Sequence, residues 1–203
     1  MDKVLIILGC ISTVCIAYYI YGVLKGNRIC NQLANMLVGG RYEDFGKLAG
    51  SKQAKRYAKP FTLSFLKLNA AIAQKDDKQV NKILECFEKE KLNQMQESAV
   101  YSRVFYYYVA NGNYDEARSI YNKMLNHNVA VDNRIRYVFN TYCEGEFEYI
   151  EEIEKLLSTL KEEERTEYYA LLADMYKNKK DMDKSEEYRN LVLAKMKQAP
   201  DQK

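Results

Sequence analysis

The chain contains no tryptophan, a single histidine and only two prolines, Pro60 and Pro200, among its 203 residues. Glycine is also scarce, with nine residues. All-β folds need turn residues at short intervals, so this scarcity of helix breakers favours helices. The hydrophobic fraction of 47% and the charged fraction of 29% are ordinary for a folded protein. The composition therefore predicts a folded, helical chain.

Motifs typical of catalytic and cofactor sites are missing as well. The glycines form no GxGxxG, GxxxxGK[ST] or GxSxG pattern. One histidine, His127, cannot supply the ligands of a common zinc site. The nine glutamates from Glu144 to Glu164 are interspersed with Lys155 and Lys161 and are interpreted as solvated helix faces. We expect no catalytic, cofactor or metal site; the alternative is an atypical hydrolase or transferase around His127, Cys143 or the glutamates.

The cysteines give no support to a disulfide framework or a metal site. Five are present, an odd number, and no two form a CxxC pair. In the predicted helices, Cys86 and Cys143 are interpreted as small buried hydrophobic residues. No reactive or cross-linked cysteine is predicted.

An uncharged stretch of 21 residues runs from Val4 to Leu24. As a helix it would reach roughly 30 Å, the thickness of a bilayer's hydrocarbon core. We therefore predict a transmembrane anchor over residues 1–25, with the membrane as a partner. The expected membrane-interface residues are Tyr18, Tyr19, Tyr21, Lys25 and Arg28.

Charge is distributed unevenly along the chain. Residues 1–60 hold nine Lys/Arg against three Asp/Glu, whereas the remainder holds 22 against 25. Basic residues that follow a membrane span favour a cytoplasmic location for the body. We expect a single-pass protein of the cell membrane with a cytoplasmic C-terminal domain. A cleaved or inverted N-terminal segment, which would place the body outside the cytoplasm, is the alternative. The body has no basic face, so no nucleic-acid partner is expected.

A helix–turn–helix pattern occupies the middle of the chain. It reads Tyr101-x2-Val104-Phe105-x2-Tyr108, then Asn111-Gly112-Asn113, then Ala117-x3-Tyr121. A second copy reads Tyr169-x2-Leu172-Ala173-x2-Tyr176, with Ser185 in the place of Ala117. These two copies resemble the tetratricopeptide repeat, which pairs two antiparallel helices every 34 residues. Phe105 departs from the pattern, which prefers a small residue there, and Arg189 occupies an aromatic position.

Three further pairs are predicted mainly from the spacing. The five units begin near residues 26, 61, 98, 131 and 166. The resemblance implies an all-α fold, an α-solenoid of about five antiparallel helix pairs after the anchor. The expected divisions are the anchor (1–25), a basic juxtamembrane segment with a degenerate first pair (26–60), the repeat domain (61–197) and a disordered tail (198–203).

The resemblance also implies a binding surface, because the first helix of each pair lines a concave groove in this family. Candidate partner-binding residues at those positions are Phe65, Asn69, Tyr106, Phe139 and Tyr142. Aromatic anchors of this kind are common in interfaces. The expected function is that of a non-catalytic scaffold, which binds a protein or peptide at the cytoplasmic face of the membrane. The alternative is a structural protein that self-associates, or whose helix at 185–196 fills its own groove.

Overall fold

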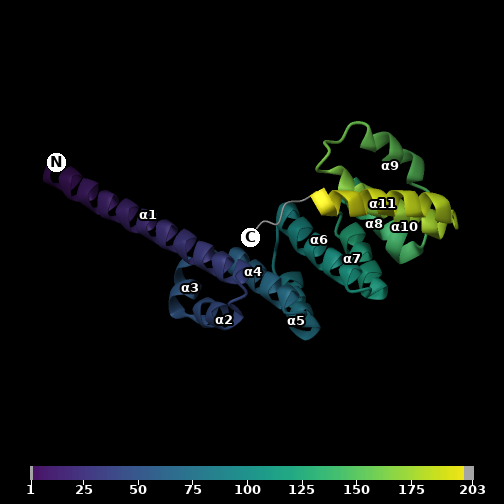
Figure 1. Cartoon of the computed structure of the whole chain (residues 1–203). Coiled ribbons are helices and arrows are strands. Elements are labelled where there is room, and N and C mark those ends of the chain that lie inside the picture. Colours follow the sequence, from purple (N-terminus) through teal and green to yellow (C-terminus); the bar gives the residue numbers. More distant parts are fainter. Residues whose placement is uncertain (1, 199–203) are drawn as a thin grey trace. The chain divides into compact units, whose positions relative to one another are not determined.

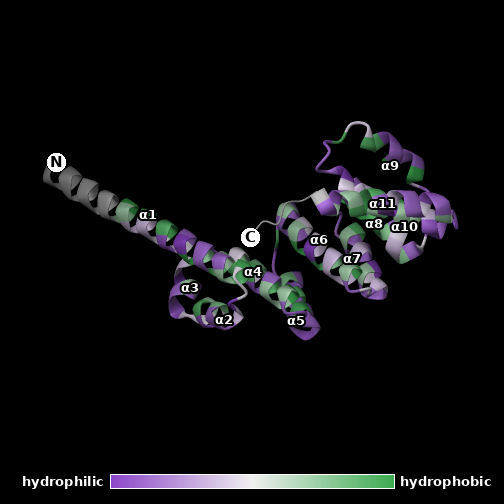
Figure 2. Cartoon of the chain, in the orientation of Figure 1, coloured by the Kyte–Doolittle hydropathy of each residue, from purple (hydrophilic) through white to green (hydrophobic). Residues whose placement is uncertain are grey.

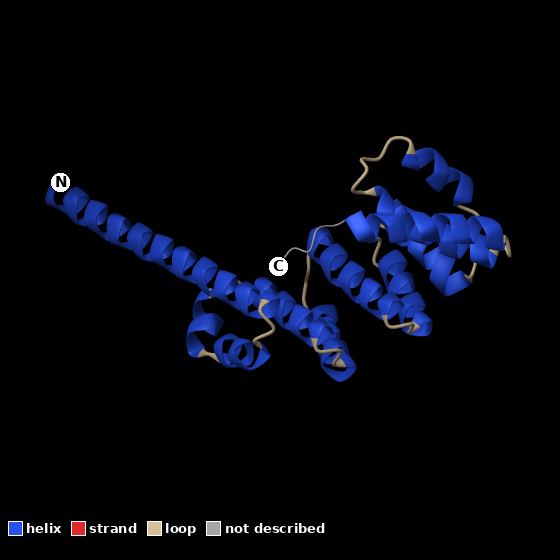
Figure 3. Cartoon of the chain, viewed as in Figure 1, coloured by secondary structure: helices blue, strands red, loops and turns tan. Residues whose placement is uncertain are grey.

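The computed structural model of the chain describes the backbone of residues 2–198 and the side chains of residues 15–197. Within that range it contains eleven α-helices, one short π-helix and no β-strand (Figure 3). The all-helical class predicted from the sequence is therefore confirmed. Residues 199–203 of the predicted tail lie outside the described residues.

Short connections join successive helices (Figure 1). In chain order the elements are α1 (Asp2–Val38), α2 (Tyr42–Gly50), α3 (Lys52–Tyr57), α4 (Pro60–Ala73), α5 (Asp77–Lys89), α6 (Gln94–Ala110), α7 (Tyr114–Asn126), α8 (Asn133–Val138), the π-helix η1 (Phe139–Glu144), α9 (Ile150–Leu157), α10 (Arg165–Asn178) and α11 (Met182–Gln198). Three pairs of consecutive helices are in extensive contact: α4 with α5, α6 with α7, and α10 with α11.

The turns inside these three pairs have the same backbone form. Each contains one residue in the left-handed region, namely Lys75 (φ 53°), Gly112 (φ 75°) or Lys180 (φ 65°). The next residue donates its backbone N–H to the carbonyl oxygen five positions earlier, as in the 2.9 Å bond from Asn113 to Tyr108. This arrangement satisfies the last carbonyl groups of the first helix. The chain thus reverses in the same way in each pair, although only one of the three turns has the expected glycine.

The chain divides into two compact units, one ending at Leu92 and the other beginning at Asn93. This division falls inside the range 61–197 that was expected to be one repeat domain. In the first unit, α1 packs against α2, α3 and α4. Its core includes the fully buried Leu33 and the nearly buried Ile29 and Phe45. The N-terminal part of α1 extends beyond α2–α5 (Figure 1).

The predicted membrane anchor is wrong. None of the helices in the described part of the chain combines the length and apolar character needed to cross a bilayer. Instead of ending near residue 25, α1 continues through Lys25 and Arg28 to Val38. Hydrophilic residues are interspersed with hydrophobic ones along its described side chains (Figure 2). The single-pass membrane location and the orientation derived from it are withdrawn with the anchor. The side chains of residues 1–14, part of the predicted span, lie outside the described residues.

Close packing between α1 and the α3–α4 connection depends on Gly26. A Cβ atom built on Gly26 would overlap the carbonyl oxygen of Tyr57 and lie 3.0 Å from its carbonyl carbon. These atoms belong to the backbone, which cannot move aside as a flexible side chain can. Only a residue without a side chain lets the two segments approach this closely.

We expect Gly26→Ala to lower the free energy of unfolding by about 1–3 kcal/mol, because the new methyl group forces α1 away from Tyr57. Gly46→Ala in α2 is the matched control, since a Cβ atom added to Gly46 would meet no other atom within 4 Å. That control should raise stability by up to about 1 kcal/mol through helix propensity. Urea unfolding followed by circular dichroism measures both. Equal stabilities of the two variants would contradict the steric argument.

In the second unit, the pair α6–α7 buries Val104 and Phe105 from α6 against Ala117 and Met124 from α7. Phe105 is fully buried at the position where the repeat pattern prefers a small residue. Its ring lies 5.5 Å from that of Tyr106 and 6.3 Å from that of Tyr121. The bulky side chain is therefore accommodated within an aromatic cluster.

In the α10–α11 pair, small and aromatic residues make the contacts between the helices. Ser185 is buried and donates a hydrogen bond to the carbonyl oxygen of Ala173 (2.8 Å). Tyr188 stacks on Tyr176 with ring centroids 5.7 Å apart. Both tyrosine hydroxyls donate to one carboxylate oxygen of Glu154 in α9, at 2.9 and 2.7 Å. Tyr188 thus supplies the aromatic contact that Arg189 cannot.

Candidate functional site

Tyr106 lies where α6, α8 and α10 contribute neighbouring side chains. Its ring is half-buried on α6, and the guanidinium of Arg134 from α8 lies 5.7 Å from the ring centroid. Arg134 forms an ion pair with Glu167 from α10. A cation over an aromatic face is attracted by the negative charge of the ring's π system. We call these three residues the Tyr106 surface.

Electrostatics at the Tyr106 surface keep the phenol neutral. Burial raises the pKa of Tyr106 to about 12, and the carboxylates of Asp132 and Glu167 add to this effect. The cation of Arg134 acts in the opposite direction and lowers the pKa. The side chains of Arg134 and Glu167 are about half exposed, at 47% and 59%. The surface therefore offers an aromatic ring, a cation and an anion to the solvent side.

Phe139 and Tyr142 are held in a different contact. Phe139 stacks face to face on Tyr121 of α7, with ring centroids 3.8 Å apart. Tyr142 stacks on Tyr114 at 6.5 Å and donates a hydrogen bond to Asp174 of α10 (2.8 Å). Both residues are half-buried and lie in η1. These contacts hold the π-helix against α7 and α10. Much of the surface of both side chains is therefore already in contact with other residues of the chain.

The other two groove candidates belong to the first unit. Phe65 of α4 is half-buried and stacks on Phe61 at 5.7 Å. Asn69, one turn further along α4, is also half-buried. The structure thus divides the five candidates between its two units, and within the second unit Tyr106 has a guanidinium from a neighbouring helix over its ring.

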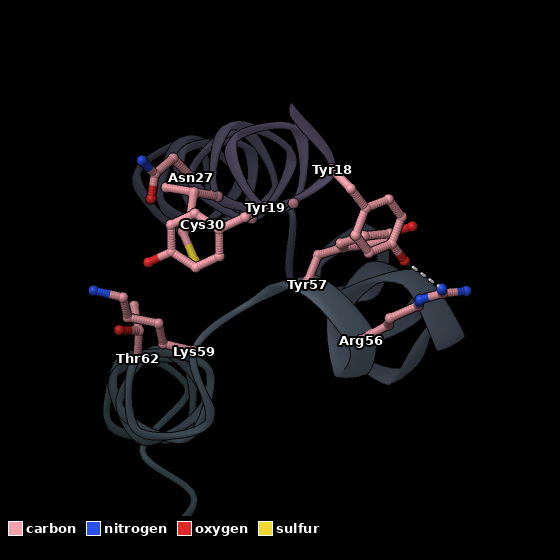
Figure 4. Close-up of a pocket in the computed structure, with 11 residues that line it drawn as sticks. Tyr18, Tyr19, Asn27, Cys30, Arg56, Tyr57, Lys59 and Thr62 are labelled. Carbon is pink, nitrogen blue, oxygen red and sulfur yellow. Dashed lines mark hydrogen bonds between the residues drawn. The ribbon is translucent and has the colours of Figure 1, made fainter. Parts of the chain in front are cut away.

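Three of the five residues expected at a membrane interface contact side chains of α3. Tyr18 accepts a hydrogen bond from Arg56 (2.7 Å), and the ammonium of Lys25 lies 4.6 Å from the ring centroid of Tyr57. Tyr21 meets the same Tyr57 ring edge to face at 6.3 Å. The two remaining residues line cavities, Tyr19 the one that Cys30 also lines (Figure 4) and Arg28 the one that Gln53 also lines.

Side chains that bind metal ions do not converge in the described part of the chain. No cluster of three or more His, Cys, Asp or Glu side chains there could hold a metal ion. His127 packs edge to face on Tyr101, and its Nδ1 lies 3.3 Å from a carboxylate oxygen of Glu97. Cys143 is buried as predicted, whereas Cys86 is exposed, contrary to the prediction.

Sequence reasoning selected Tyr106 but missed its neighbours. Neither Arg134 nor Glu167 is among the residues predicted from the sequence to bind a partner. Arg134 and Glu167 both lie near the start of a helix, α8 and α10 respectively. Their similar positions could have indicated that they share a face with Tyr106. That inference needs the packing of α6, α8 and α10, which spacing does not provide.

Comparison with known proteins gives no relative: no protein-family model, curated protein or solved structure matches the chain. The resemblance to the tetratricopeptide repeat therefore rests on the motifs themselves.

The pKa of Tyr106 predicts a specific alkaline behaviour. An ordinary tyrosine loses its proton near pH 10, and this applies to the unfolded chain. In the folded chain Tyr106 keeps its proton to about pH 12. Between these values the folded state binds more protons, so Tyr106 makes the wild type lose stability as the pH rises. Tyr106→Phe should lose less stability over this range in urea unfolding measured from pH 9 to 12. Parallel curves would contradict the assignment.

We expect Phe139→Ala to lower the unfolding free energy by about 2–4 kcal/mol, because it removes a ring stacked on Tyr121. Phe147→Ala is the control, since Phe147 is 40% exposed. Its loss should be below about 1 kcal/mol. Chemical unfolding of both variants provides the measurement. A small effect at Phe139 would show that its ring is available for a partner instead.

Proposed function

We propose that this chain is a non-catalytic helical scaffold that binds a protein or peptide through the Tyr106 surface. The observation that carries the proposal is the convergence of Tyr106, Arg134 and Glu167 from α6, α8 and α10. The implied tetratricopeptide-like arrangement also assigns ligand binding to the first helices of the pairs. The geometry and the motif resemblance therefore favour the same face.

The chemistry of the Tyr106 surface suits a peptide better than a reacting substrate. Arg134 and Glu167 already neutralise each other, and the neighbouring phenol stays protonated at neutral pH. A half-buried tyrosine offers large contact area at a small cost in side-chain entropy. Arginine is likewise enriched among the residues that dominate binding energy. A partner would place an apolar side chain against Tyr106 and a charged group beside Arg134 or Glu167.

Site-specific photocrosslinking tests this proposal in cells that express the full chain. A photoreactive phenylalanine analogue replaces Tyr106 and, as the control, the exposed Leu125 of α7. We expect a crosslinked product with a different protein from position 106 and none of the same size from position 125. Adding Arg134→Glu should reduce the yield at least about fivefold, because it places two carboxylates at the former ion pair.

The products also separate the proposal from its alternative. A crosslink from position 106 only to another copy of this chain would support self-association and contradict a separate partner. Equal products from positions 106 and 125, or none from either, would also reject the Tyr106 surface as the binding site. Thermal unfolding of the Arg134→Glu chain confirms that the loss of crosslinking does not come from unfolding.

A further inference from the structure

The first unit contains a cavity of about 440 Å³ where α1, α3 and the start of α4 meet (Figure 4). From α1 it is lined by Tyr18, Tyr19, Val23 and Cys30, among others. Gly22 and Gly26 also line it, and the absence of a side chain at Gly26 lets α1 lie against the backbone of Tyr57 at this point. A cavity of this size, formed by three elements, is large enough for a small molecule.

The charges around this cavity have one sign. Arg56 and Lys59 line it, and none of the 11 lining residues is acidic. The guanidinium of Arg56 donates to the neutral hydroxyl of Tyr18 and has no carboxylate partner among the described residues. Lys59 likewise has no ion pair with a described side chain. A group of cations without acidic partners attracts an anion.

Hydrogen-bond donors accompany Lys59 in the cavity. The side chains of Tyr19 and Asn27 face it from α1, and Lys59 and Thr62 face it from the start of α4 (Figure 4). No side chain caps the first turn of α4. Hydroxyl, amide and ammonium groups together can satisfy the several oxygen atoms of a carboxylate or phosphate.

The remaining wall of the cavity is apolar or aromatic. Val23 and the two glycines contribute from α1, and Tyr57 contributes from α3. We propose that this cavity binds a small organic anion, in which a carboxylate or phosphate group is joined to an aromatic body. The anionic group contacts Lys59, Thr62 and Asn27, and the aromatic body packs between Val23 and Tyr57. This site lies in the first unit and does not depend on the Tyr106 surface.

Cys30 supplies a local reporter, because its thiol lines the cavity. Burial raises the pKa of this thiol, and the nearby Lys59 partly offsets the effect. The rate of Cys30 alkylation by N-ethylmaleimide is measured by mass spectrometry of the peptide, with the exposed Cys86 as an internal control. The probes are 2-naphthoate, 2-naphthyl phosphate and the uncharged 2-naphthalenemethanol, each added to the full chain.

We expect at least one anionic probe to slow alkylation of Cys30 about fivefold or more while Cys86 reacts at an unchanged rate. The uncharged probe should protect at least about tenfold less well at equal concentration, because it lacks the group that pairs with Lys59. The comparison of naphthoate with naphthyl phosphate identifies which anion the cavity prefers. Equal protection by all three probes, or protection by none, would overturn the proposal.

Two substitutions assign the effect to the cavity. Lys59→Gln should weaken protection by the anionic probe about tenfold, because it removes the cation beside the bound group. Lys55→Gln removes the same charge from an exposed position of α3 that does not line the cavity. It should change protection less than twofold. If the two variants behave alike, long-range charge and not the cavity accounts for binding, and the proposal fails.

Discussion

The approach of α1 to the α3–α4 connection is the constraint on which the first unit depends. Gly26 sits where any Cβ would overlap the backbone of Tyr57. Because the two segments come this close, Ile29 and Leu33 of α1 can join the core with Ala54 and Leu63. The cavity that Cys30 lines lies beside the same contact and opens to solvent. Gly26 therefore contributes both to the packing of the first unit and to the lining of its candidate ligand site.

The second unit relies on aromatic contacts between successive helices. A chain of rings runs from Tyr106 through Phe105 and Tyr121 to Phe139, and so joins α6, α7 and η1. At the other end, Glu154 accepts hydrogen bonds from Tyr176 and Tyr188 and joins α9 to α10 and α11. Most tyrosines of this unit thus stabilise the fold. Tyr106 also contacts side chains from neighbouring helices, and the Arg134–Glu167 ion pair beside its ring joins α8 to α10.

The incorrect anchor shows where composition misleads. A run of uncharged residues is typical of a membrane span, but the number of apolar residues does not reveal which of them pack against other helices. Tyr18, Tyr21 and Lys25 were assigned to a lipid interface because of their position after the run. Their actual neighbours are Arg56 and Tyr57, which lie more than thirty residues away in the chain. The sequence around residues 18–25 does not by itself indicate these contacts.

The sequence by itself determined the helical class, since scarce breakers and apolar periodicity act locally through backbone propensity. It also determined where the α6–α7 turn lies, because glycine favours the left-handed conformation found at Gly112. The turns at Lys75 and Lys180 have the same form, although a residue with a side chain occupies the left-handed position in each. Three features are visible only in the folded structure: Phe139 stacks on Tyr121, Arg134 lies over Tyr106, and Arg56 and Lys59 line one cavity beside α1. These features arise from contacts between distant segments, whose distances depend on how complete helices pack.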